Sequence, residues 1–240
     1  MRIEKLSFPD QQVLCVFPRK HSDLEEVASE LCLEANYPVI VLIGGGIDEQ
    51  QAVVTKKAIQ AISVVAEDMH ALIICGGTDM GVMAEIGQVR WQNRYEFPLI
   101  GISPEELVTW PGGPSSTKFL WWGTKRWQLE EHYSHFILVP GRHFGEESSW
   151  IVETATILSK GSRSVTILIN GGDVSRTDIE LSLEHGRPII ALSGTGRLAD
   201  ELDSQPDRNK LITMVPADSE ERVIAEIRAA LLDNRGTKLI

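Results

Sequence analysis

The sequence predicts an α/β protein with a mainly parallel, Rossmann-like sheet and helices on both faces. Short apolar runs rich in β-branched residues recur along the chain, and glycine follows most of them. Stretches with the 3.6-residue period of a helix come next. Strands that alternate with helices in this way require right-handed crossovers, and therefore a parallel sheet that is buried on both sides.

The apolar runs give the expected strands, and the periodic stretches give the expected helices. Eight runs are predicted as strands: Val13–Phe17, Val39–Ile43, Ala71–Cys75, Leu99–Ile102, Phe136–Val139, Val165–Ile169, Pro188–Leu192 and Leu211–Val215. Examples of the predicted helices are Glu49–Val65, Asp79–Trp91, Arg176–Glu184 and Glu220–Leu232. We expect one domain over residues 1–240, with an irregular, Trp-rich loop insertion at about 110–131.

Composition and charge exclude several classes of protein. The 240 residues carry a formal net charge of −11, which opposes binding to a phosphate backbone, so we expect no nucleic-acid partner. No apolar run approaches the roughly 20 residues of a membrane span, and the N-terminus does not resemble a signal peptide. Three cysteines without a C-x-x-C pair fit a reducing compartment. We therefore expect a cytoplasmic protein without a membrane segment in this chain.

Glycine-rich loops follow four of the predicted strands. Their residues are Gly44, Gly45 and Gly46, then Gly76, Gly77 and Thr78, then Gly171 and Gly172, then Gly194, Thr195 and Gly196. Glycine lets a ligand approach the backbone, and the N–H groups at the start of the following helix attract phosphate. A single glycine doublet often only makes a turn, but four at one sheet edge predict a pocket for a polyanionic, nucleotide-like ligand.

Two common nucleotide-binding signatures do not fit. Glu49 stands where the dinucleotide-binding fingerprint needs glycine or alanine, so a hydride-transferring dehydrogenase is disfavoured. Lys118 follows Gly112 and Gly113 at the wrong spacing for a phosphate-binding P-loop.

Four short motifs, taken in order, resemble one family. They are Cys75-Gly-Gly-Thr-Asp-Met-Gly-Val-Met83, Ser134-His135-Phe136, Asn170-Gly171-Gly172 and Gly194-Thr-Gly-Arg-Leu-Ala-Asp200. This series resembles the cytosolic N-terminal SLOG region of melastatin-type (TRPM) channels, and in particular its prokaryotic stand-alone versions. The resemblance covers roughly residues 38–232. It implies a Rossmann-like domain that binds a nucleotide-derived ligand such as ADP-ribose and that requires no cofactor.

The resemblance also implies individual ligand contacts. Arg197 stands where the channel loop supplies a ligand-contacting arginine, and its alternative role is an ion pair with Asp200. Phe144 matches an aromatic residue of the channel site, whereas Ile151 stands where the channel has an arginine. The expected ligand-binding residues are Arg197, Phe144 and positions in or next to the glycine loops. In chain order they are Gly44, Gly45, Gly46, Gly76, Gly77, Thr78, Gly81, Val82, Phe144, Gly171, Gly172, Thr177, Gly194, Thr195, Gly196 and Arg197.

An enzyme is the alternative. Residues 171–180 resemble, with two extra residues, the glycine-rich Thr-x-x-Glu motif of Lonely Guy phosphoribohydrolases, which cleave the N-glycosidic bond of nucleoside 5′-monophosphates. In that alternative Glu180 and Asp173 are catalytic. The same segment also fits simple helix capping, through Ser175-x-x-Asp178 or Thr177-x-x-Glu180. A third possibility is a structural homo-oligomeric domain that has lost its ligand.

Four of the six tryptophans gather between residues 110 and 131, together with Lys118, Lys125 and Arg126. Their positions are Trp110, Trp121, Trp122 and Trp127. Such a segment suits either a lid over a nucleotide or a subunit interface, and we expect a homo-oligomer, with a dimer as the common case. No metal site is predicted, because His132 and His135 lack further ligands at a suitable spacing.

Overall fold

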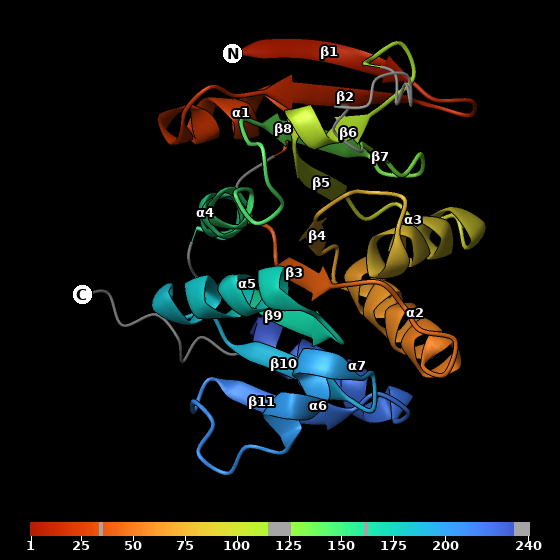
Figure 1. The fold of residues 1–240 in the computed structure, drawn as a ribbon, viewed down its shortest axis with the longest axis vertical. Coiled ribbons are helices and arrows are strands. Elements are labelled where there is room, and N and C mark those ends of the chain that lie inside the picture. Colours follow the sequence, from red (N-terminus) through yellow and green to blue (C-terminus); the bar gives the residue numbers. More distant parts are fainter. Residues whose placement is uncertain (34–35, 115–125, 161–162, 233–240) are drawn as a thin grey trace, which may run out of the picture.

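One twisted sheet forms the centre of the molecule (Figure 1). The computed structural model describes residues 1–33, 36–114, 126–160 and 163–232. Within these ranges, nine strands follow the spatial order β1-β2-β8-β5-β4-β3-β9-β10-β11. Their bounds are β1 Arg2–Ser7, β2 Gln12–Phe17, β3 Val39–Gly44, β4 Leu72–Cys75, β5 Leu99–Pro104, β8 His135–Val139, β9 Ser164–Ile169, β10 Ile189–Ser193 and β11 Ile212–Pro216. All neighbouring strands are parallel except β1 and β2.

Helices cover both faces of this sheet. The helices are α1 Leu24–Glu30, α2 Ala52–Asp68, α3 Gly81–Gln92, α4 Ser148–Ser159, α5 Asp173–Glu184, α6 Arg197–Asp203 and α7 Glu220–Leu232. Buried side chains of α2, α3 and α7 form one apolar cluster, and those of α1, α4, α5 and α6 form the other. The predicted α/β, Rossmann-like class is therefore confirmed.

The order of the strands places a switch point in the middle of the sheet. From β3 the chain moves outward through β4 to β5, whereas from β9 it moves in the opposite direction through β10 to β11. Since β3 and β9 are neighbours, their following loops diverge to opposite faces. In open α/β sheets, ligands bind in the crevice that this divergence leaves beyond the carboxyl ends of the strands.

All eight predicted strands are present, with bounds that differ by one or two residues. The prediction missed β1, because this edge strand contains three charged residues and buries only Leu6. It also missed the short pair formed by β6 (Val108–Thr109) and β7 (Trp127–Gln128), as well as helix α1. Among the described residues, no helix is long and apolar enough to cross a membrane.

Candidate functional site

Asn170 joins three loops at the switch point. Its side-chain oxygen accepts the N–H of Gly45 at 2.9 Å, and its amide nitrogen donates to the carbonyl of Gly46 at 2.8 Å. Its backbone N–H donates to the Thr195 hydroxyl at 2.8 Å, and its carbonyl accepts the N–H of Ala199 at 2.9 Å. Through its side chain and its backbone, this one buried residue thus fixes the loops after β3, β9 and β10 relative to one another. The sequence analysis quoted Asn170 in a motif but did not predict this role.

The loop after β4 is held against the same centre. The N–H of Val82 donates to the carbonyl of Gly45 at 3.2 Å, where α3 begins. Gly81 has a φ of +52°, and a Cβ at this position would lie 2.1 Å from that carbonyl oxygen. Only glycine fits this contact, so the predicted importance of Gly81 has a packing cause.

The guanidinium of Arg197 lies over two of the glycine loops. A Cβ at Gly45 would lie 3.1 Å from Arg197 Nη1, and a Cβ at Gly172 would lie 2.9 Å from Nη2. The side chain makes no hydrogen bond or ion pair with any other described residue. Its backbone is left-handed, with a φ of +53°, as is that of Asn170 at +49°. Non-glycine residues in this region are uncommon and cluster at functional sites.

Asp200 organises the loop before α6 and does not pair with Arg197. Its two carboxylate oxygens accept the N–H groups of Gly194 at 2.6 Å and Gly196 at 3.1 Å. The ion pair that we considered as the alternative role of Arg197 is therefore absent from this structure. The arginine remains available to a ligand at the carboxyl edge of the sheet.

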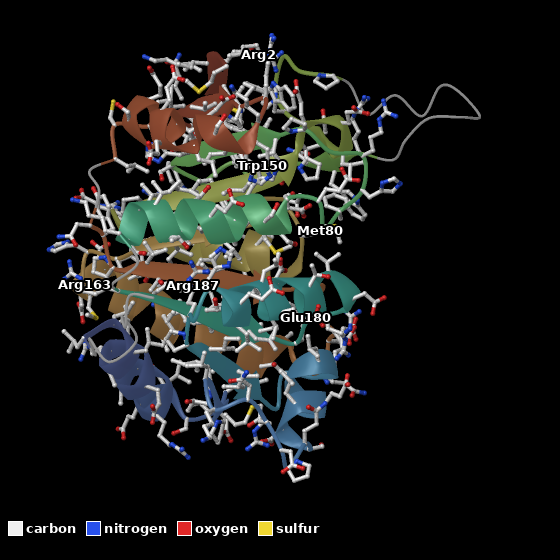
Figure 2. The ribbon with its side chains drawn as sticks, turned by 90° about the vertical axis from the view of Figure 1, so that its left-hand side faces the viewer. Arg2, Met80, Trp150, Arg163, Glu180 and Arg187 are labelled. Carbon is white, nitrogen blue, oxygen red and sulfur yellow. The ribbon has the colours of Figure 1, made fainter. Side chains whose placement is uncertain are left out.

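A cavity of about 270 Å³ adjoins these loops. Its walls come from the ends of β3 and β4, the start of α3, Trp127, and the facing starts of α4 and α5. The lining residues are Leu42, Ile43, Gly44, Gly45, Gly46, Gly76, Thr78, Met80, Met83, Trp127, Phe144, Glu147, Ile151, Val174, Ser175 and Asp178. In Figure 2, α4 and α5 lie side by side, with Met80 beside their N-terminal ends.

The predicted ligand-binding residues divide between this cavity and the loops around it. Those that line the cavity are Gly44, Gly45, Gly46, Gly76, Thr78 and Phe144. The others lie outside its lining: Gly77, Gly81, Val82, Gly171, Gly172, Thr177, Gly194, Thr195, Gly196 and Arg197. Ile151, which replaces an arginine of the channel, forms part of the apolar wall.

The two predicted catalytic carboxylates do not face the cavity. Asp173 and Glu180 are exposed on α5, and Figure 2 shows Glu180 on the outer side of that helix. Residues one helical turn apart share a face, and here Val174, Ser175 and Asp178 point into the cavity. The register of α5 therefore brings Asp178 to the site that the sequence analysis gave to Glu180.

Two buried carboxyl groups line the cavity, and the sequence analysis predicted neither. Burial raises the pKa of Glu147 to about 7, and the nearby charge of Asp178 adds to this increase. Burial raises the pKa of Asp178 to about 6, although the adjacent Ser148 hydroxyl favours its ionised form. The only sequence signal was Ser175-x-x-Asp178, which we interpreted as helix capping. Carboxyl groups with raised pKa values in a cavity are typical of functional sites.

The Trp-rich segment contributes to the site through its last residues. The N–H of Asp79 donates to the carbonyl of Gln128 at 2.8 Å, and that of Glu130 donates to Gly77 at 3.0 Å. These bonds hold Trp127 against the cavity. Trp110 instead packs in the core against Phe17, with ring centroids 5.8 Å apart. Lys118, Trp121, Trp122 and Lys125 lie outside the described residues.

The two histidines considered as metal ligands, His132 and His135, make other contacts. His132 Nδ1 lies 2.6 Å from Oε1 of the buried Glu130, and neither residue lines the cavity. The pKa of His135 falls to about 4 because burial and the charge of Arg90 disfavour its protonated form. Within the described ranges, no group of three or more His, Cys, Asp or Glu side chains is arranged to hold a metal ion.

A parallel α/β sheet with glycine loops, a bridging asparagine and a free arginine at its switch point defines a Rossmann-like ligand-binding class of protein. Residues 37–233 match the family model described as "SLOG in TRPM, prokaryote". The chain belongs to this family, as its motifs predicted. No curated protein matches the sequence.

Solved structures of similar fold have low sequence identity. The crystal structure of the structural-genomics target TM1055 has a TM-score of 0.56 at 17% identity and covers 79% of this chain and 98% of its own. A molybdenum cofactor binding protein from Rippkaea orientalis has a TM-score of 0.54 at 17% identity, covering 82% and 98%. The molybdenum cofactor carrier protein of Chlamydomonas reinhardtii has a TM-score of 0.54 at 18% identity, covering 82% and 100%. At these identities the likeness establishes the shared fold.

Proposed function

We propose that this protein binds a nucleotide-derived ligand, ADP-ribose or a related NAD-derived nucleotide, at the switch point between β3 and β9. The observation that carries the proposal is the position of Arg197. Its guanidinium lies over Gly45 and Gly172 and has no partner among the described residues. Because both neighbours are glycines, no side chain blocks the approach of a ligand to the backbone there. A planar guanidinium binds the oxygens of a diphosphate through two parallel hydrogen bonds.

The family and the structural neighbours support a small-molecule ligand. Melastatin-type SLOG regions are the relatives that suggest ADP-ribose, and two of the neighbours are named for the molybdenum cofactor that they bind or carry. The apolar walls of the cavity suit a nucleoside, and the aromatic side chains of Trp127 and Phe144 offer surfaces for a base. A sensor role requires that this binding favours one of two states of the protein.

Calorimetric titration with ADP-ribose, NAD and AMP tests the proposal. We expect ADP-ribose to bind, and Arg197→Ala to weaken its affinity at least tenfold, because a charge-assisted bond to phosphate is lost. Arg222→Ala is the matched control, since Arg222 is an exposed arginine on α7. Failure of every nucleotide to bind, or equal binding by Arg197→Ala, would overturn the proposal.

A nucleoside monophosphate phosphoribohydrolase is the second candidate. It is favoured by Glu147 and Asp178, because two buried carboxyl groups with raised pKa values can exchange protons near neutral pH. In this candidate function the catalytic role passes from Glu180 and Asp173 to Glu147 and Asp178, the carboxyl groups that face the cavity. Chromatography of AMP after long incubation separates the two functions. Free base that disappears in Asp178→Asn but persists in Glu180→Gln would establish the hydrolase.

A further inference from the structure

One wall of the cavity is acidic, whereas the loops beside the cavity suit an anion. Glu147 is 6% exposed and lies immediately before α4, and Asp178 is 7% exposed and lies in the second turn of α5. The two helices pack against each other, so the two carboxyl groups share one wall of the cavity. The cavity lining contains no lysine, arginine or histidine.

This wall leaves polar atoms unsatisfied. Asp178 Oδ1 and the hydroxyl oxygen of Ser148 have no partner in hydrogen-bond geometry in the described structure, although the two side chains lie close enough for the hydroxyl to favour the ionised form of Asp178. Glu147 Oε2 accepts the N–H of Gly145 at 2.7 Å, and the backbone N–H of Glu147 itself also favours the ionised carboxyl group. A buried carboxylate oxygen without a donor costs free energy, and native proteins avoid this cost unless a ligand or water completes the bond. Beside the nearby Ser148 hydroxyl, Asp178 therefore has the capacity to accept a further donor, which a ligand can bring.

The chemistry of the wall restricts this donor. A phosphate is repelled by two carboxyl groups, so it belongs at Arg197 on the other side of Gly45. A metal ion lacks a third protein ligand, since the described residues hold no cluster of three ligating side chains. A neutral group with two adjacent hydroxyls meets both requirements, because each hydroxyl donates one hydrogen bond to a carboxylate oxygen.

We propose that Asp178 and Glu147 bind the hydroxyl groups of a ribose, so that the ligand enters the cavity with its nucleoside end and leaves its phosphates on the glycine loops. This inference rests on the proposed function and adds the orientation of the ligand to it. The cavity volume of about 270 Å³ is consistent, because complete ligand pockets measure about 300–1,000 Å³. The cavity thus has room for one nucleoside of the ligand, and the phosphates lie at the edge of the cavity.

Removal of the hydroxyls from the probe gives a test that needs no variant. We compare AMP with 2′,3′-dideoxy-AMP by calorimetry on the wild-type protein, and we expect AMP to bind at least tenfold more tightly. Each charge-assisted hydrogen bond that is lost accounts for roughly this factor. Equal affinity for the two probes, with both still weakened by Arg197→Ala, would overturn this inference and leave the proposed function standing.

The variants Asp178→Asn and Glu147→Gln locate the contact. They keep the size of the side chain and remove its negative charge, so we expect the preference for AMP over dideoxy-AMP to fall to about threefold or less. Glu184→Gln is the control, because Glu184 is an exposed carboxylate on the same helix. An unchanged preference in both folded variants would contradict the proposal. Failure of wild type to bind any of these nucleotides would overturn both the inference and the proposed function.

Discussion

A few residues at the switch point form the candidate site. They hold its loops mainly through hydrogen bonds to backbone groups. Asn170 holds the loops after β3, β9 and β10 through bonds to Gly45, Gly46 and Thr195. Asp200 holds the loop before α6 through two backbone N–H groups. With the loops fixed by these two residues, the guanidinium of Arg197 stays free for a ligand. A site of this kind is organised before its ligand arrives.

Replacement of Asn170 tests this organisation. Asn170→Asp keeps the acceptor for Gly45 but loses the donor to Gly46 and places a charge beside its carbonyl. We expect urea unfolding to show a loss of about 1–3 kcal/mol, because buried polar groups lose their partners. Binding of ADP-ribose should also weaken about tenfold. Asn170→Gly is the comparison, since it tolerates the φ of +49° without supplying a side chain. Wild-type stability and affinity in Asn170→Asp would contradict the account.

At the scale of elements, the pair formed by α4 and α5 carries the acidic wall of the cavity. The pKa values of Glu147 and Asp178 rise to about 7 and about 6 on folding. The native protein therefore holds protons, between about pH 4 and pH 7, that the unfolded chain has already released. Because the native state binds more protons in this window, its stability falls as the pH rises through it. The acidic wall therefore lowers the stability of the native protein near neutral pH, as expected for groups kept for a function such as the proposed ribose contact.

Asp178→Asn removes part of this cost. We expect the variant to unfold at about the same urea concentration as wild type near pH 4.5, and to be about 1–3 kcal/mol more stable at pH 8. The comparison at each pH is made with Glu184→Gln, which removes an exposed carboxylate from the same helix. A difference between Asp178→Asn and wild type that does not grow with pH would rule out this explanation.

Arg187 fixes α4 to the sheet at some distance from the cavity. It is buried, and its guanidinium donates to Ser164 Oγ, to the carbonyl of Val152 and to Thr156 Oγ1, each at 3.0 Å. Burial lowers its pKa to about 10, and no described carboxylate pairs with it. Figure 2 shows it between α4 and α5.

Arg187→Lys tests this contact. Lysine carries the same charge but cannot reach three acceptors in the same geometry, so we expect a loss of about 1–3 kcal/mol in urea unfolding. Binding of ADP-ribose by the folded variant should change little. Arg222→Lys, at an exposed arginine on α7, is the control. An unfolding midpoint equal to that of wild type would mean that Arg187 does not hold α4 in place.

The elements also show what a sequence can predict. Runs such as Val39–Ile43 and Val165–Ile169 are apolar on both faces, so their periodicity and glycine ends identified the parallel strands directly. The glycine loops and Arg197 were predicted because short motifs carry them. Glu147 and Asp178 were not, because their significance depends on the register of two helices that meet only in the folded structure. A shift of two residues along α5 separates the exposed Glu180 from the buried Asp178.

For the whole molecule, the site connects the two halves of the sheet. Loops from β3 and β4 on one side meet loops from β9 and β10 on the other, and Asn170 bridges them. A ligand that contacts both sets of loops favours the state in which the halves are joined, and binding stabilises that state by mass action. The hairpin of β1 and β2 lies at the far edge of the sheet, away from these loops (Figure 1).

Hydrogen exchange with and without ADP-ribose tests this connection. We expect slower exchange in the loops on both sides of the switch point, at residues 44–52 and 76–82 as well as 170–176 and 194–200. Exchange in β1 and β2 should remain unchanged, which provides an internal control. Protection confined to one half of the sheet would show that the ligand does not bridge the switch point.

The most direct measurement of the central claim is a crystal structure of the protein with ADP-ribose. The account predicts diphosphate oxygens within hydrogen-bond distance of the Arg197 guanidinium, over Gly45 and Gly172. It also predicts a ribose in the cavity, with hydroxyls donating to Asp178 and Glu147. ADP-ribose bound away from the ends of β3 and β9, or bound there without contact to Arg197, would contradict the account.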